Sequence, residues 1–246
     1  MTVLIQRAGY FFGMIALVVG LALAARALAG SGISVGPLSL EISPRSRVAV
    51  LEIGNYRSEP LDLQASVVDW RQENGEDRLA PTEDVVVSPA ITSVPPGKRQ
   101  IFRLAFRGVP DPERERAFRV MVADVSAPAT KPETEASVSF RVTNSVPLFV
   151  RPNMKVAPQL AIAACHAPGH EACLEVRNTG AAHTRVRRIA MSGSGWTQTL
   201  TPNVVLLAGT RRVFTTQIAE ARPGRFSAQV EGEGAAVSGD IDGEVP

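Results

Sequence analysis

The sequence predicts an all-β protein with two immunoglobulin-like β-sandwich domains that follow an N-terminal signal peptide. Short segments with period-two alternation, or with many Val and Ile residues, recur along the chain, and turn-forming residues separate them. No stretch after Gly30 has the periodicity of a long amphipathic helix. The 246 residues include 20 glycines and 18 prolines, which favours many short elements over a few long ones.

The first 29 residues have the pattern of a secretory signal peptide. Arg7 precedes an apolar run over residues 8–25, and Ala27-Leu28-Ala29 ends the segment with small residues at the cleavage position. We therefore expect cleavage after Ala29 and no stable membrane anchor afterwards. The alternative is a retained transmembrane anchor, because the apolar run approaches the ~20 residues that cross a bilayer.

Charge gives no support for a nucleic-acid partner. Removing residues 1–29 takes away Arg7 and Arg26 and no acidic residue, which leaves 24 basic and 24 acidic side chains. A nucleic-acid-binding domain ordinarily carries a basic excess. Of the 26 basic residues of the full chain, 23 are arginines, which suit bidentate pairing with carboxylates.

Seven candidate strands fill the first half of the mature chain, at the spacing typical of an immunoglobulin-like sandwich. Turn signals such as Asn74-Gly75 and Pro95-Pro96-Gly97 separate them. The seven segments are Leu38–Ser43, Arg47–Ile53, Leu61–Trp70, Asp84–Val87, Arg99–Phe106, Ala117–Val125 and Ala136–Val150.

A second series of candidate strands begins after Arg151-Pro152-Asn153, which interrupts a long apolar run. We therefore place the first domain at residues 30–152 and the second at residues 153–246. The alternative is a single large barrel. The segments of the second series are Leu160–Ala164, Ala172–Arg177, Thr184–Met191, Thr197–Leu200, Thr210–Ile218, Gly224–Gln229 and Ala236–Ile241.

The two cysteines, Cys165 and Cys173, flank a short segment that also contains His166 and His170. These four residues are enough in number for a tetrahedral zinc site, although the spacing is not that of a usual zinc finger. An exported chain enters an oxidising compartment, where two cysteines ordinarily pair. Pro168-Gly169 also favours a hairpin turn that brings the two sulfur atoms together. We expect a disulfide rather than a metal site.

The sequence contains little that could support catalysis. It has three histidines, and it lacks the nucleophile elbow, the metalloprotease helix and the phosphate-binding glycine loop. We therefore expect a protein that is not an enzyme and that uses no cofactor.

The segment Ala136–Val150 is longer than an ordinary strand. Val138, Phe140 and Val142 share one face, and Val146, Leu148 and Val150 continue the same parity. A long edge strand with apolar alternation risks aggregation unless a partner covers it. Such an edge can also act as the template for addition of a partner's strand.

A set of short motifs occurs in a fixed order across the first domain. They are Leu51-Glu52-Ile53-Gly54-Asn55, Trp70-Arg71-Gln72, Pro81-Thr82, Ser88-Pro89, Pro96-Gly97, Gln100-Ile101-Phe102-Arg103-Leu104, Phe118-Arg119-Val120 and Val146-Pro147-Leu148-Phe149-Val150-Arg151-Pro152. With these motifs the chain resembles the periplasmic pilus-assembly chaperones of the PapD-like family, in particular their archaic branch.

The resemblance implies two immunoglobulin-like sandwiches arranged as a boomerang, with a cleft between them. Chaperones of this family bind pilus or fimbrial subunits whose own sandwich lacks a strand, and they deliver these subunits to an outer-membrane usher. The resemblance places the donated strand here at Val138–Val142, with Val138, Phe140 and Val142 filling the groove of the subunit.

The chain departs from the family in the cleft. Well-studied members anchor the terminal carboxylate of the subunit with two basic residues, and those positions are Ser39 and Pro147 here. Arg45, Arg47 and Arg151 are the candidates that could replace them. The resemblance also implies a salt bridge near the domain junction, which we expect between Glu115 and Arg151.

We therefore expect a periplasmic, non-enzymatic chaperone for pilus subunits. The alternative is a secreted structural or adhesion protein built of two β-sandwiches, and a third interpretation is a metal-binding protein centred on Cys165 and Cys173.

Overall fold

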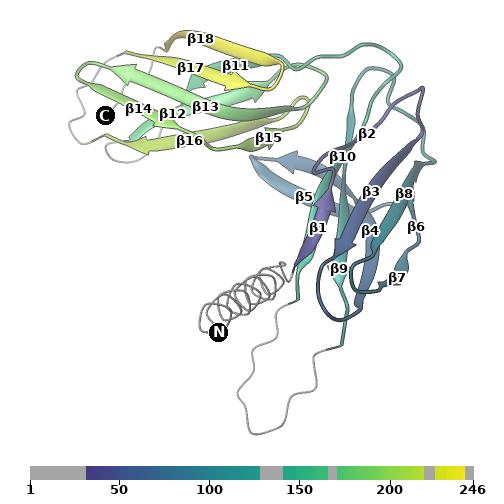
Figure 1. The fold of residues 1–246 in the computed structure, drawn as a ribbon. Helices are drawn as coiled ribbons and strands as arrows, with labels where there is room; N and C mark the ends of the chain where they lie inside the picture. The colour runs from purple at the N-terminus through teal and green to yellow at the C-terminus, as the bar shows by residue number, and fades with distance from the viewer. Residues whose placement is uncertain (1–31, 128–140, 166–170, 219–224, 242–246) are drawn as a thin grey trace, which may run out of the picture.

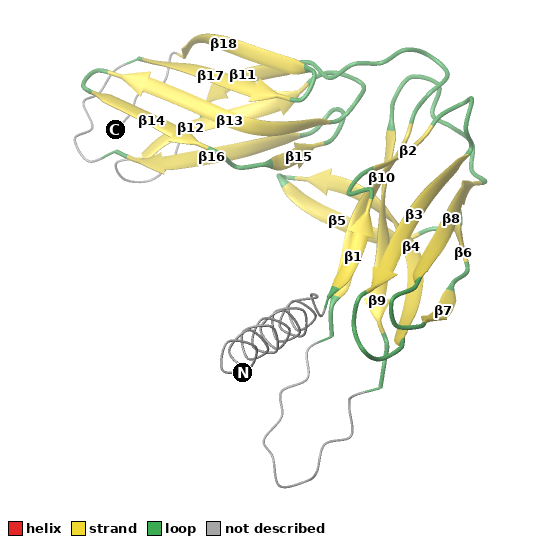
Figure 2. Ribbon diagram, in the orientation of Figure 1, coloured by secondary structure: helices red, strands yellow, loops and turns green. Residues whose placement is uncertain are grey.

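The computed structural model describes residues 32–127, 141–165, 171–218 and 225–241. Within these ranges the chain forms 18 β-strands and no helix. The strands build four sheets, two in each of two sandwiches that meet at an angle (Figures 1 and 2). None of the described ranges holds a helix with the length and apolarity needed to cross a bilayer.

The first domain packs a four-stranded sheet, ordered β1-β3-β8-β6, against a sheet ordered β2-β10-β9-β4-β5 in which β7 also pairs with β4. Its strands are β1 (Ile33–Gly36), β2 (Leu40–Ile42), β3 (Val48–Asn55), β4 (Leu61–Glu73), β5 (Glu76–Pro81), β6 (Val85–Ser88), β7 (Ile91–Val94), β8 (Arg99–Phe106), β9 (Arg116–Asp124) and β10 (Thr143–Val150).

Apolar side chains at alternate positions fill the space between the two sheets of the first domain. Leu51 and Ile53 of β3 and Phe102 of β8 face Phe118 of β9 and Leu148 of β10, and all five are fully buried. This arrangement follows from the period of two along each strand, because every second side chain points into the sandwich.

The second domain has a sheet ordered β11-β12-β16 and a sheet ordered β14-β13-β17-β18, in which β15 also pairs with β13. Its own buried cluster includes Leu174, Val186, Ile189 and Val230. The strands are β11 (Leu160–Ala164), β12 (Glu171–Asn178), β13 (Thr184–Gly193), β14 (Trp196–Leu200), β15 (Val204–Leu206), β16 (Arg211–Gln217), β17 (Phe226–Gly232) and β18 (Ala235–Ile241).

A buried asparagine ends one strand in each domain. Asn55 closes β3 and donates to the carbonyls of Glu59 and Val94, each over 2.8 Å. Asn178 closes β12 and donates to the carbonyl of Ala182 over 2.8 Å. Each amide satisfies backbone groups of a loop that would otherwise be buried without a partner.

The turn between β4 and β5 requires left-handed backbone at two successive residues. Asn74 has φ 53° and Gly75 has φ 82°, which are the signs that a two-residue type I′ hairpin demands. Asn-Gly is the pair best suited to those values, since both residues tolerate positive φ. The long β4–β5 hairpin reaches the second domain, where Gly75 lies against the backbone of Arg211 and Arg212.

Candidate functional site

The β10 strand is paired along one edge over its full length, and only in part along the other. Its eight residues pair with β9 from Thr143 to Val150. On the opposite edge, β2 runs parallel to β10 and pairs only with its last three residues, Leu148 to Val150. No described strand covers Thr143–Pro147, so this stretch is an open sheet edge of the kind that can accept a further strand.

The hydrogen bonds show which backbone groups face the open edge. The Val142 carbonyl accepts from the Asp124 N–H of β9 over 3.0 Å, whereas the Arg151 N–H on the other side donates to Ile42 of β2 over 2.8 Å. Because these directions alternate along an antiparallel pair, Thr143 and Ser145 point their backbone groups toward the open edge.

The buried row of β10 ends in an exposed apolar residue. Val146, Leu148 and Val150 lie in the core of the first domain, as their parity predicts. Val142 has the same parity, but it precedes the first residue of β10 and is 47% exposed. Val138 and Phe140, the other two residues of the expected donor strand, lie outside the described residues.

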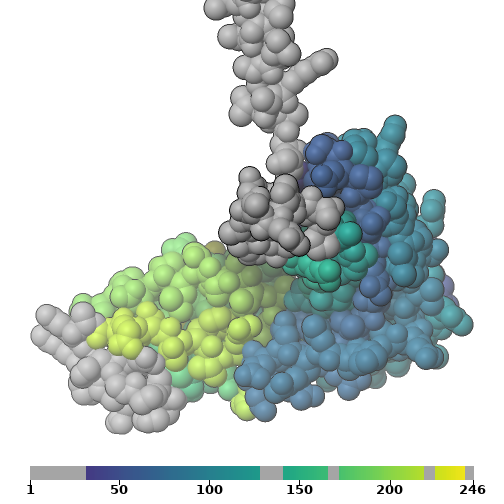
Figure 3. Space-filling model, turned by 90° about the horizontal axis from the view of Figure 1, so that it is seen from below, coloured from purple at the N-terminus to yellow at the C-terminus, as the bar shows by residue number. Residues whose placement is uncertain are grey.

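The two domains meet on the outer face of the sheet that contains β10. Trp70 of β4, Ala117 of β9 and Phe149 of β10 point away from the core of the first domain and pack on Val205 and Leu207 of the second. In the space-filling view the second domain (yellow-green) lies directly against the first (blue) (Figure 3). The face is apolar because it is buried at the domain junction.

Polar contacts complete this junction. The Gln72 amide donates to the carbonyl of Val205 over 2.9 Å and accepts from the Leu207 N–H and the Thr210 hydroxyl, each over 3.0 Å. Glu115 accepts from the backbone N–H of His183 over 3.1 Å, and its Oε1 lies 2.5 Å from His183 Nδ1.

A cavity of about 730 Å³ lies beside the junction and is lined by both domains. Ser39, Ser145 and Pro147 reach it from β10 and from the segment before β2, so the two family positions that lack charge here do line it. The basic side chains of the lining are Arg119 from β9, Arg185 and Arg187 from β13, and Arg212 from β16.

The three arginines expected as carboxylate anchors have other surroundings. Arg45 is exposed in the turn before β3, and Arg47 donates to the carbonyls of Phe106 and Gly108 over 3.3 and 3.4 Å. Arg151 Nε lies 2.8 Å from Glu41 Oε2, a close ion pair without hydrogen-bond geometry. None of the three is part of the cavity lining.

The expected salt bridge between Glu115 and Arg151 is corrected by the structure, which gives each residue another partner. Glu115 binds His183 of the second domain, and Arg151 binds Glu41. Arg151 follows β10, whose parallel pairing places Phe149 opposite Glu41 and brings the end of β10 alongside β2. Glu115 precedes β9, and its N–H donates to Ala181 in the loop that leads to His183.

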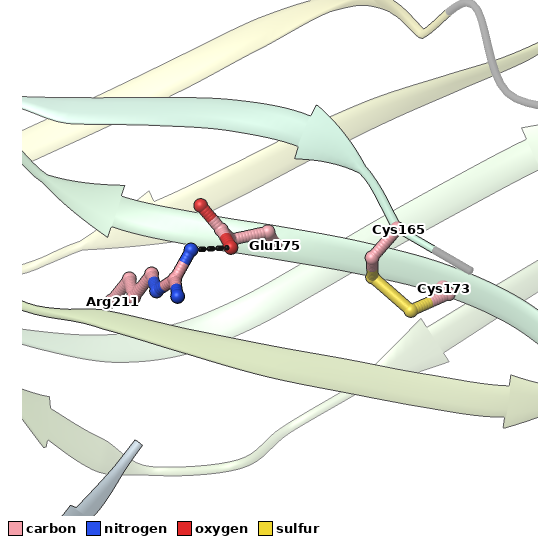
Figure 4. The surroundings of a disulfide bond; sticks show 4 residues. All are labelled: Cys165, Cys173, Glu175 and Arg211. Atoms are coloured by element: carbon pink, nitrogen blue, oxygen red, sulfur yellow. Dashed lines mark hydrogen bonds and ion pairs between the residues drawn. A yellow bond between two sulfur atoms is a disulfide. The ribbon is translucent and has the colours of Figure 1, made fainter. Parts of the chain in front are cut away.

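The disulfide between Cys165 and Cys173 is confirmed. The bond links the end of β11 to β12, and the Cys165 N–H also donates to the Cys173 carbonyl over 3.2 Å. Figure 4 shows the bond near an ion pair between Glu175 and Arg211. Sulfur atoms joined in a disulfide are not thiolate ligands, which removes the basis of the zinc interpretation. His166 and His170 lie outside the described residues.

Sequence reasoning did not single out Arg119, Arg212, Gln72 or His183 as functional residues. The sequence does contain a pattern that predicts the apolar surface near these residues. The segment Val146–Val150 is apolar at both parities, which indicates a strand buried on both faces. Which polar residues face that surface depends on the pairing of β4, β9 and β10 and on how the second domain packs against this sheet. A single strand of sequence reveals neither.

The family model for pili and flagellar-assembly chaperones, PapD N-terminal domain, matches residues 32–155, just over half of the chain. No curated protein sequence matches the chain.

Several solved structures share the fold. One is the CsuC–CsuE chaperone–tip adhesion subunit pre-assembly complex of archaic Csu pili from Acinetobacter baumannii, with 16% identity, a TM-score of 0.61, and coverage of 85% of this chain and 98% of that one. The Escherichia coli chaperone DraB has 18% identity, a TM-score of 0.54, and coverage of 85% and 97%.

A third is the Salmonella enterica SafA pilin in complex with the SafB chaperone, with 14% identity, a TM-score of 0.56, and coverage of 85% and 94%. The family-model match together with this shared two-sandwich fold identifies the chain as a member of the PapD-like family of pilus-assembly chaperones.

Proposed function

We propose that this protein is a periplasmic chaperone that stabilises pilus or fimbrial subunits by donating a β-strand and then delivers them to an outer-membrane usher. In this proposal residues 1–29 are an export signal that is removed. Residues 30–152 form the domain that donates the strand, and residues 153–246 form the second domain. The role requires no chemical step and no cofactor.

The observation that carries the proposal is the open edge of β10 beside a row of apolar side chains. Backbone groups of Thr143 and Ser145 are available to a partner strand, and Val142 extends the buried row of β10 into solvent. Val138 and Phe140 continue that row in sequence. Main-chain hydrogen bonds would complete the sheet of an unfinished subunit, while the apolar side chains would cover its core.

The apolar side chains supply a large part of the expected affinity. Burying one side chain of this size contributes about 1.5–3 kcal/mol. Since about 1.4 kcal/mol is a factor of ten in affinity, one residue changes binding by about ten- to hundredfold. Subunit release at the usher requires that the bound state remain exchangeable.

Phe140→Asp tests the donor-strand role in co-expression with a pilus subunit that is recovered together with the unaltered chain. We expect an unchanged circular dichroism spectrum and at least a tenfold loss of subunit recovered with the chaperone. Val142→Asp should act in the same direction. The matched control is Val109→Asp, which places the same charge at a side chain that is 84% exposed elsewhere in the first domain.

Full recovery of the subunit with both donor-strand variants would remove the donor-strand assignment. If instead no subunit is recovered with the unaltered chain, and the protein self-associates outside the cell, the alternative of a secreted structural or adhesion protein replaces the chaperone role.

A further inference from the structure

Glu115 is a buried carboxylate at the domain junction, and its ion-pair partner is a histidine. Its side chain is only 2% exposed. Its Oε1 accepts from the His183 N–H over 3.1 Å and lies 2.5 Å from His183 Nδ1. Within the described ranges its Oε2 has no hydrogen-bond partner. Burying a carboxylate is costly unless an opposite charge and hydrogen bonds compensate it. The cost of burying Glu115 therefore depends on the charge of His183.

The other charged side chains beside Glu115 are paired with one another. Asp69, Arg71 and Arg116 line a small cavity together with Glu115 at the edge of the junction. Asp69 lies 2.7 Å from Arg71 and 3.6 Å from Arg116, and Arg116 lies 2.7 Å from Asp84. Both arginines therefore contact aspartates, and neither forms an ion pair with Glu115.

His183 is the partner whose charge can change under mild conditions. Histidine is the side chain whose charge ordinarily changes between about pH 5 and pH 8. Because a carboxylate can only accept, the neutral imidazole carries its hydrogen on Nδ1, and a further proton binds at Nε2. The His183 side chain is 19% exposed and lines the cavity between the domains, so solvent can supply this proton.

Acidic and basic side chains oppose one another around His183. Those of the cavity lining are Asp77 of β5, Arg119 of β9, Arg185 and Arg187 of β13, Arg212 of β16, and Glu233 in the turn before β18. The four arginines disfavour a positive imidazole, but Asp77 and Glu233 compensate part of their charge through ion pairs. Phe149 of β10, which stacks on the imidazole, carries no charge. Because Coulomb energy is inversely proportional to distance, the direct contact of Glu115 with the ring favours the positive form.

The contact between Glu115 and His183 also joins the two domains. Glu115 precedes β9 of the first domain, and His183 ends the loop before β13 of the second. In the same loop the Ala181 carbonyl accepts from the Glu115 N–H over 2.9 Å. A positive imidazole attracts the carboxylate through its charge as well as through its hydrogen bond, whereas a neutral one offers the hydrogen bond alone. Protonation of His183 should therefore strengthen the junction.

The direction of the pH effect follows from this pairing. The positive form of His183 is favoured while the domains are joined, so its contribution is fully present in mildly acidic solution and is lost as pH rises. Once the imidazole is neutral, no opposite charge contacts the carboxylate of Glu115. Domain movements that expose this carboxylate to water then become more favourable.

We propose that the domain junction is a pH-dependent hinge, in which one proton bound by His183 holds the two domains in the orientation of this structure and its release lets them move. The inference goes beyond the chaperone function proposed above and does not depend on it. Because Phe149 belongs to β10 and stacks on His183, the hinge also links the position of the second domain to the strand with the open edge.

The distance between two spin labels on the full mature chain tests this proposal. One label is attached at Ser93→Cys on β7 and the other at Ser238→Cys on β18, so that each domain carries one label at an exposed position. Cys165 and Cys173 do not react with the labels, because they are joined in the disulfide.

The labelled chain also carries His166→Gln and His170→Gln, which leave His183 as its only histidine. We expect the distance distribution between the domains to be at least twice as wide at pH 8 as at pH 5.5. Asp and Glu ordinarily titrate near pH 4, so they add little change in this range.

Two variants assign the pH effect to this pair of residues. His183→Gln removes the group that takes up the proton, and Glu115→Gln removes the charge that the proton compensates. Each should give the same distribution width at pH 8 and at pH 5.5. The matched control is Glu113→Gln, at an exposed position two residues before Glu115, which should keep the twofold change. Circular dichroism confirms that each variant is folded at both pH values.

Equal widths at both pH values in the chain that contains only His183, or a distribution that narrows as pH rises, overturn the proposal without any further variant. A pH dependence that persists in His183→Gln or in Glu115→Gln overturns it as well. If Glu115→Gln does not fold, His183→Gln decides the outcome by itself. The measurement uses no pilus subunit, so its result is independent of strand donation.

Discussion

The ring of Phe149 lies flat on the imidazole of His183, with centroids 3.4 Å apart and planes inclined by 6°. Phe149 belongs to β10 of the first domain, and His183 precedes β13 of the second. The same imidazole approaches Glu115, whose side chain is 2% exposed. One histidine therefore makes an apolar and a polar contact across the domain junction, next to the strand that we propose binds the subunit.

Replacing His183 with alanine should loosen the junction without unfolding either sandwich. The substitution removes the ring contact with Phe149 and leaves buried Glu115 with one hydrogen bond fewer. We expect a broader distribution of interdomain distances in spin-label measurements, while the circular dichroism spectrum stays the same. Arg188→Ala, at an exposed position on β13, is the control, and an unchanged distribution in His183→Ala would contradict this role.

Gln72→Ala should uncouple the unfolding of the two domains. The amide makes three hydrogen bonds to the second domain, so its removal leaves the Leu207 N–H and the Val205 carbonyl without that partner. We expect the free energy that couples the unfolding of the two domains to fall by about 1–3 kcal/mol. Calorimetry should then show two separated unfolding transitions. Arg71→Ala should have little effect, because its ion pair with Asp69 is on an exposed side chain. Identical thermograms for both variants would refute the prediction.

Asp124 should make the stability of the protein depend on pH, with stability falling as the solution becomes acidic. This residue ends β9, and its N–H donates to the carbonyl of Val142 in the proposed donor strand. Burial by itself would raise the pKa of this carboxyl, but hydrogen bonds from Ser126 and Arg57 outweigh burial and hold the pKa below its usual value. A depressed folded-state pKa stabilises the protein fully above the unfolded pKa of about 4, and this contribution disappears as pH falls through the folded value.

At pH 7, Asp124→Asn should therefore have an unfolding free energy about 1–2 kcal/mol lower than that of the unaltered chain. Below about pH 4 this difference between the two proteins should shrink progressively. Urea unfolding at pH 7 and pH 3 measures the difference, and Glu59→Gln, at an exposed loop position, is the control. A difference of equal size at both pH values would show that Asp124 does not contribute through its charge.

The disulfide should leave no free thiol in protein purified without reductant and unfolded in guanidinium. Joint replacement of Cys165 and Cys173 by serine should lower stability by about 2–3 kcal/mol, since the bond closes a short loop. The first domain, whose core shares no residue with this hairpin, should keep its own transition. Two reactive thiols per chain in the unreduced protein would rule the bond out.

The strands that the sequence predicts best are those with strong apolar alternation. Arg99–Phe106 and Leu160–Ala164 match β8 and β11 residue for residue, and Leu61–Trp70 needs only an extension to Glu73. Four strands escaped prediction: β1, β5, β7 and β15. β1, β7 and β15 have only three or four residues, too few to show a period. All six residues of β5 are exposed, so β5 has no apolar alternation, and it forms a strand because the hairpin pairs it with β4.

The sequence by itself determined the two sandwiches, the disulfide pairing and the apolar row from Val146 to Val150, because each depends on local periodicity or on a single pair of cysteines. Only the tertiary structure decided that Arg119, Arg185 and Arg212 line one cavity, that Glu115 meets His183, and that no described strand covers one edge of β10 at Thr143–Pro147. The cavity and the Glu115–His183 contact join the β9 region to parts of the second domain more than sixty positions further along the chain. The uncovered edge depends on how far β2 extends along β10. No local pattern in the sequence encodes either relationship.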